Sequence, residues 1–142
     1  MRYSNNQTIT LFVLSCFLLI GAGFYYIKLV SSDIRIIGNS SIEYYLLVPD
    51  ILKDIPLEQT DQLMGYHYTP ADDNNPAIVS VEFITQNFAG SATEKLVHYF
   101  DGIGLKNSNN VYRKDNVEIS ITHSPSELGA VLMNVSLSNY QN

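Results

Sequence analysis

Charged side chains are scarce in this sequence, and they are unevenly placed. Lys, Arg, Asp and Glu make up 15% of the 142 residues, whereas about a quarter of the residues in an ordinary soluble domain are charged. Residues 3–27 contain none of the four. The chain carries a formal charge of −6. This acidic balance argues against a nucleic-acid-binding protein, which needs a basic surface to neutralise phosphates.

Cysteine and the familiar catalytic motifs are also missing from most of the chain. The one cysteine is Cys16, so residues 31–142 have neither a disulfide nor a thiol nucleophile. That region lacks a G-x-S-x-G motif and a glycine-rich loop that opens a helix. Its histidines, His67, His98 and His123, show no spacing that would place two metal ligands on one helical face. We therefore predict no enzymatic activity, no metal site and no cofactor.

The longest uncharged run predicts a helix that crosses a membrane. Eleven of the 19 residues at positions 9–27 are Leu, Ile, Val or Phe. A helix of that length reaches about 28 Å, close to the thickness of a hydrocarbon core. Tyr25 and Tyr26 stand near its end, where aromatic rings favour the interface, and Lys28 can extend toward the headgroups. Residues 1–30 are predicted to be a cytoplasmic tail and a single transmembrane anchor.

Two other interpretations of this segment stay open. A cleaved signal peptide would use Arg2 as its basic region and Gly21 and Gly23 as the small residues before the cut. Lipidation of Cys16 is the second alternative, because residues 13–16 loosely resemble a bacterial lipobox. The basic residues on the two sides of the segment are nearly balanced and do not set its orientation. We expect the domain at residues 31–142 to be periplasmic, because an N-terminal anchor commonly exports the domain attached to its C-terminal end.

Residues 31–142 are predicted to form one acidic domain of the α+β class. Without Arg2 and Lys28 the chain has six basic and fourteen acidic residues, a net charge of −8. Apolar and polar residues alternate in several segments, which is typical of antiparallel strands with one buried face. Strands are expected at residues 65–69, 77–85, 111–113, 117–122 and 131–138. We predict a mostly antiparallel sheet of four or five strands with one or two helices on one face.

The clearest helix signal lies at residues 92–103, where apolar residues recur at helical spacing. Gly102 and Gly104 supply the left-handed residues that end such a helix. Residues 31–41 fit either a linker or a short first strand. Two capping boxes, in which Ser and Glu side chains pair with free backbone donors, are expected at Ser91 with Glu94 and at Ser40 with Glu43.

A candidate interaction surface lies on one predicted strand and in the loop after it. Tyr66 and Tyr68 point to the same face of the strand, and tyrosine is favoured at interfaces. Half-buried sheet residues are the simpler explanation for both rings. Asp72 and Asp73 begin a run of oxygen donors at residues 72–75, a composition that calcium sites use. A turn with solvated acids explains this run as well, and the spacing of an EF-hand is absent.

These features predict a non-enzymatic, single-pass protein of the cell membrane. Its domain is expected to be an accessory or protein-interaction subunit of the cell envelope, with the lipid bilayer and an unidentified protein as partners and no nucleic acid. The alternatives are a small-ligand or cation-binding module that uses the Tyr66–Tyr68 strand and the Asp72–Asn75 loop, and a secreted protein released by signal-peptide cleavage.

Overall fold

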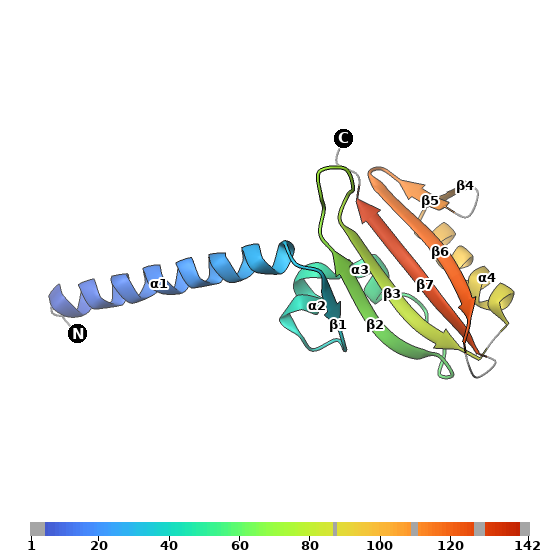
Figure 1. Cartoon of the computed structure of the whole chain (residues 1–142), viewed down its shortest axis with the longest axis horizontal. Coiled ribbons are helices and arrows are strands. Elements are labelled where there is room, and N and C mark those ends of the chain that lie inside the picture. Colours follow the sequence, from blue (N-terminus) through green and yellow to red (C-terminus); the bar gives the residue numbers. More distant parts are fainter. Residues whose placement is uncertain (1–4, 87, 109–110, 127–129, 140–142) are drawn as a thin grey trace. The chain divides into compact units, whose positions relative to one another are not determined.

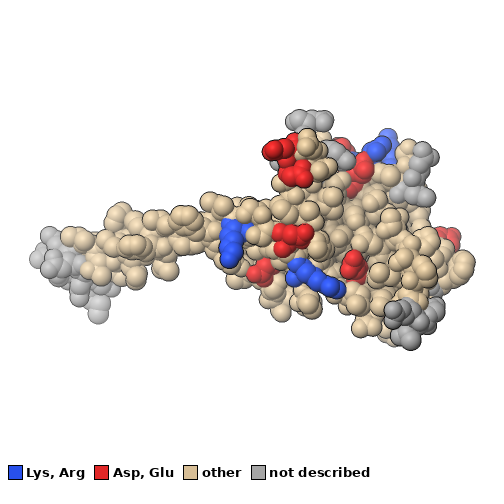
Figure 2. Space-filling view, in the orientation of Figure 1, with Lys and Arg blue, Asp and Glu red and all other residues tan. Residues whose placement is uncertain are grey.

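A computed structural model describes residues 5–86, 88–108, 111–126 and 130–139. The chain divides into two units, Met1–Ser32 and Asp33–Asn142. The first contains helix α1 (Asn5–Val30), in which Thr8–Val30 is long and apolar enough to cross a membrane. A signal sequence would share this length and composition, so α1 is a candidate transmembrane helix. Along α1 the space-filling view shows basic atoms only near the C-terminal end (Figure 2). The predicted tail precedes residue 9. Residues 5–8 of it belong to α1, and residues 1–4 lie outside the described residues.

The second unit is built on a seven-stranded antiparallel sheet (Figure 1). Its spatial order is β1-β2-β3-β7-β6-β5-β4. The strands are β1 (Ile34–Ile36), β2 (Gln62–Thr69), β3 (Ile78–Thr85), β4 (Lys106–Ser108), β5 (Val111–Lys114), β6 (Val117–Pro125) and β7 (Val131–Asn139). The antiparallel arrangement is confirmed, but the predicted count of four or five strands is too low. The edge strands β1 and β4 have three residues each, which is too short to show a period of two.

The register explains why the alternation in the sequence was informative. Val81 lies opposite Val135, and Ser80 lies opposite Ser136, on the central strands β3 and β7. The side chains of successive residues on these two strands therefore point alternately to the apolar face and to the polar face of the sheet. The hairpin between β5 and β6 turns at Asp115, whose backbone φ is +52°. This is the left-handed conformation that Asp tolerates in tight turns.

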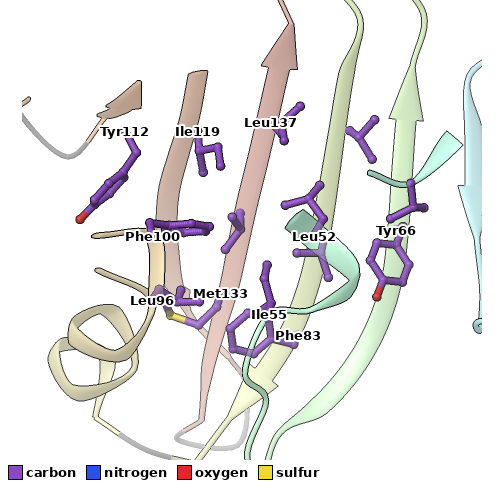
Figure 3. Close-up of a cluster of buried hydrophobic side chains, with 14 of the residues drawn as sticks. Leu52, Ile55, Tyr66, Phe83, Leu96, Phe100, Tyr112, Ile119, Met133 and Leu137 are labelled. Carbon is purple, nitrogen blue, oxygen red and sulfur yellow. The ribbon is translucent and has the colours of Figure 1, made fainter. Parts of the chain in front are cut away.

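In the described part of the domain three helices accompany the sheet, one more than the predicted maximum: α2 (Ile42–Leu47), α3 (Asp50–Lys53) and α4 (Ala89–Gly102). Figure 1 shows α3 and α4 behind the same face of the sheet. Leu52 of α3 and Leu96 and Phe100 of α4 are buried against the apolar face, as Figure 3 shows. Every residue of this buried cluster lies between Ile36 and Leu137, so the domain has its own core.

The predicted start of α4 is wrong by three residues. The helix begins at Ala89 with Phe88 as its N-cap, and Phe88 makes no side-chain capping bond. The backbone N–H of Ser91 already donates to the Phe88 carbonyl at 2.9 Å. Because a turn has formed before Ser91, this serine lies inside the helix and does not form a capping box with Glu94. The predicted stop is confirmed at Gly104, which has a φ of +83°. It is wrong at Gly102, which is the last residue of the helix and has no positive φ.

Helix α2 has a serine N-cap, one residue later than predicted. The Oγ of Ser41 accepts the backbone N–H of Tyr44 at 3.1 Å, so Ser41 caps the helix in place of Ser40. None of the six residues of α2 is fully buried. Its inward side chains, Tyr44 and Leu47, are partly buried against the core.

Candidate functional site

A groove of about 720 Å³ lies between α4 and the loop that follows α3. Residues 56–58 form the loop side, and Pro56 and Leu57 supply apolar surface there. Ser91, Lys95 and His98 line the helix side. Their spacing of four and three residues places them on one face of α4. The volume falls within the range of about 300–1,000 Å³ that is typical of ligand sites.

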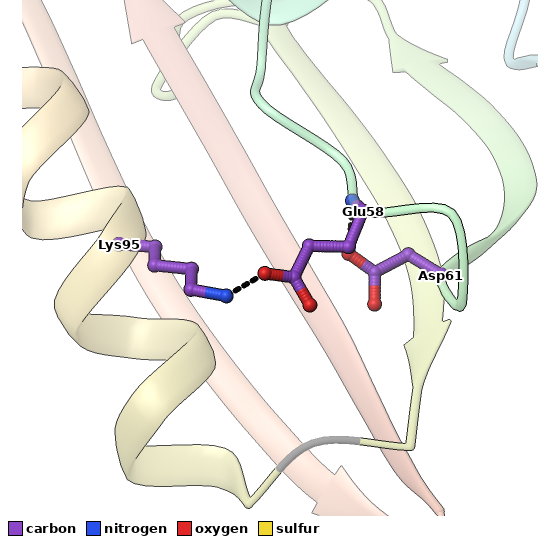
Figure 4. A network of polar contacts seen from close by, with 3 residues as sticks. All are labelled: Glu58, Asp61 and Lys95. Carbon is purple, nitrogen blue, oxygen red and sulfur yellow. Dashed lines mark hydrogen bonds and ion pairs between the residues drawn. The ribbon is translucent and has the colours of Figure 1, made fainter.

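An ion pair between Lys95 of α4 and Glu58 of the loop spans the groove (Figure 4). The backbone N–H of Glu58 also donates to Oδ2 of Asp61 at 2.7 Å, which holds the loop in a turn. Oδ1 of Asp61 is buried and has no hydrogen-bond partner within the described residues. The charged side chains of the pair are 46% and 42% exposed, so we expect it to contribute at most about 1 kcal/mol to stability.

The serine and the histidine of the groove lie too far apart to act together on one reacting atom. Ser91 and His98 are seven residues apart on α4, which separates them by about 10 Å along the helix axis. They therefore do not form a nucleophile–base pair, which needs hydrogen-bond contact. Tyr99 donates its hydroxyl to the Ile51 carbonyl at 3.1 Å and so ties α4 to α3. Burial, followed by the charge of Asp54, raises the pKa of Tyr99.

Tyr66 and Tyr68, the predicted interaction residues on β2, point into the core. They are 5% and 8% exposed and belong to the apolar cluster on the helix-covered face. The ring of Tyr66 meets that of Tyr44 edge-on, with centroids 5.3 Å apart. Burial, followed by the charge of Tyr44 and a hydrogen bond with it, raises the pKa of Tyr66 to about 12. Packing accounts for both rings, and their predicted role in an interaction surface stays a prediction.

Asp72 and Asp73 lie in the exposed loop between β2 and β3. Oδ1 of Asp72 accepts the backbone N–H groups of Asn74 and Asn75 at 2.9 and 2.8 Å. The Asn75 amide donates to both carboxylate oxygens. These hydrogen bonds lower the pKa of Asp72. Local loop closure therefore explains the run of oxygen donors. In the described part of the chain, no group of three or more His, Cys, Asp or Glu side chains could hold a metal ion.

The structure thus separates the four predicted residues into a buried pair and a loop pair, and it shows two surfaces that we did not predict. One is the groove beside α4. The other is the outward face of α2, where Ile42, Tyr45 and Leu46 are 61%, 67% and 54% exposed. Tyr45 and Leu46 follow Ile42 by three and four residues, a helical spacing that was visible in the sequence. It indicates an apolar helix face, but it does not say whether that face turns toward the sheet.

Comparison of the chain with protein-family models, curated proteins and solved structures found no match. Inferences about function therefore depend on the chemistry of the groove and of the exposed surfaces.

Proposed function

We propose that this chain is a single-pass membrane protein whose domain binds a protein partner as a non-enzymatic accessory subunit. The groove beside α4 is the observation that carries the proposal. It combines the apolar surface of Pro56 and Leu57 with a polar rim from α4. Recognition surfaces of proteins commonly have such an apolar centre and a hydrated polar rim.

The charge of the groove suggests which partner segment would fit. Glu94 and Glu58 bring two carboxylates to the rim, and Lys95 neutralises one of them. The domain as a whole has a net charge of −8 from its six basic and fourteen acidic residues. A segment with one apolar side chain and neighbouring basic residues would complement this surface. We therefore propose an extended, basic and apolar peptide segment as the bound element.

Photo-crosslinking in native membranes tests the groove directly. A photoreactive amino acid at His98 of the full-length chain should yield one adduct of defined mass, because His98 lines the groove. The same amino acid at the exposed Thr122 on β6 is the control and should not yield that adduct. At near-native expression, the absence of an adduct from position 98, or identical adducts from both positions, would contradict the proposal.

The proposal also places the domain outside the cytoplasm, which a reporter fused after Asn142 tests. A reporter that is active only in an exported location should be active, since α1 would carry the domain across the membrane. Activity of the matched cytoplasmic reporter alone would reverse the proposed orientation without affecting the groove.

The alternative cation-binding function has less support, because the Asp72 carboxylate is already engaged by its own loop. We expect millimolar calcium to leave the thermal unfolding midpoint unchanged. A ligand that binds only the folded state must stabilise it. A reproducible rise in the unfolding midpoint with calcium, lost in the Asp72→Asn variant, would support the cation-binding function.

A further inference from the structure

The outward face of α2 is apolar. Ile42, Tyr45 and Leu46 lie on this face and are more than half exposed, and Ile37, just before the helix, is 78% exposed. We call these four residues the α2 patch. The charged residue within α2 is Glu43, and it is only partly exposed. A helix that faced only water would carry polar side chains at such positions.

The chain itself keeps the α2 patch close to the end of α1. Helix α1 ends at Val30 and β1 begins at Ile34, so three residues connect them. Ile37 follows Val30 by seven residues, and even a fully extended chain of that length spans at most about 25 Å. This limit holds wherever the domain sits relative to α1. A tether this short gives the patch a high effective concentration at any surface near the end of α1.

The residues near the end of α1 indicate which surface that is. Tyr25 and Tyr26 are the kind of aromatic residues that collect at a membrane interface, and Lys28 lies in the last turn of the helix. If α1 spans the bilayer, the interface lies beside these residues. The α2 patch then starts about ten residues beyond it along the chain.

We propose that the α2 patch inserts into the interfacial layer of the bilayer that α1 crosses, an inference that rests on the anchor part of the proposed function. Aliphatic side chains with a tyrosine suit the boundary between headgroups and acyl chains. The patch has no basic residue, so a zwitterionic lipid suffices and anionic lipid is not required. The weak affinity of so short a helix is sufficient because the anchor supplies the tether.

The absence of tryptophan from the chain makes a clean test possible. Tyr45→Trp places a single fluorophore in the patch, and Leu46→Trp is a second reporter should the first variant fold poorly. Lys106→Trp is the control. It lies on β4, the edge strand opposite β1, and six strand spacings of about 4.8 Å separate the two edges. Each full-length variant is reconstituted in phosphatidylcholine vesicles with and without brominated acyl chains.

We expect brominated lipid to reduce the emission of Tyr45→Trp to about half, and to leave Lys106→Trp nearly unchanged. A water-like emission maximum without quenching would overturn the inference. A blue-shifted but unquenched emission would do the same, because a protein would then cover the patch. Flotation of the same samples keeps the two proposals apart. If the protein floats with the vesicles but its emission is not quenched, only the insertion of the α2 patch is refuted. If the protein does not float, the anchor is refuted.

Discussion

Helices α2 and α4 both pack against the apolar face of the sheet, yet their outward faces differ. The outward face of α4 carries Ser91, Glu94, Lys95 and His98, which is ordinary for a surface in water. The outward face of α2 carries large apolar side chains instead. Both helices therefore pack apolar side chains against the core, and only α2 has a second apolar face. The difference indicates that the two helices meet different surroundings.

Their inward faces differ in how deeply they are buried. Leu96 and Phe100 of α4 are 2% and 0% exposed, whereas α2 contributes only the partly buried Tyr44 and Leu47. Since stability scales with the apolar area removed from water, α4 should matter more for the fold. The outward face of α2 contributes little to the core, and we propose that it contacts the membrane, whereas the groove beside α4 is the proposed site for a protein partner.

The inward face of α4 should give the largest effect on stability. Leu96→Asp buries a carboxylate without a partner and should lower the free energy of unfolding by several kcal/mol. Glu94→Ala on the outward face is the control and should change it by less than about 0.5 kcal/mol. Urea denaturation of the fragment 31–142, which contains the whole core, measures both. A loss below about 1 kcal/mol for Leu96→Asp would contradict the packing of α4 on the sheet.

High pH should loosen the contact beneath α2. The pKa of Tyr66 is raised from 10.0 to about 12, so the folded state holds this proton more tightly than the unfolded chain does. The resulting stabilisation is complete below pH 10 and is lost as the pH rises from 10 to about 12. Urea midpoints measured across this window should fall, and Tyr66→Phe should reduce the slope. An unchanged slope in Tyr66→Phe would show that the phenol is not buried against Tyr44.

The two helix starts should respond differently to the loss of a serine hydroxyl. Ser41→Ala removes the N-cap of α2 and should cost about 1 kcal/mol of unfolding free energy. Ser91→Ala lies inside α4 and should cost less than about 0.5 kcal/mol, because alanine is a better helix former than serine. Equal costs for the two variants would support the capping box that the sequence suggested at Ser91.

The outward face of α2 should give the smallest effect on folding. The double variant with Ile42→Ser and Leu46→Ser removes only exposed apolar groups, so the unfolding free energy of the fragment should change by less than about 0.5 kcal/mol. The fragment should also become more soluble, which light scattering can measure. A large loss of stability would show that this face packs in the core. It would contradict the stated difference between the outward faces of α2 and α4.

The features that depend on local pattern were predictable from the sequence. Alternation predicted the five longer strands, and helical spacing together with Gly104 predicted the body and end of α4. Residues 31–41 fitted either a linker or a short first strand, and the structure contains that strand as β1. Strand β4 was missed, because three residues carry no measurable period. The α4 cap was expected at Ser91, because a capping box is defined by residue types while the real cap depends on where the first turn forms.

The candidate site was less predictable because it depends on tertiary contacts. The strand pattern showed that Tyr66 and Tyr68 share a face, and only the packed structure shows that this face is buried. The groove joins residues 56–58 to α4, segments more than thirty residues apart. Neither segment has a motif that would predict the other. For the same reason the apolar spacing of α2 did not reveal that it faces outward.

Retention of α1 in the mature protein is the central claim, and the intact mass of the chain captured from whole cells together with their medium tests it most directly. We predict the mass of the full-length chain, 15.9 kDa before any tag. A mass lowered by the loss of roughly the first 23 residues, as cleavage after Gly23 would produce, would contradict this claim. That result would identify a released domain with no anchor to hold α2 near a membrane.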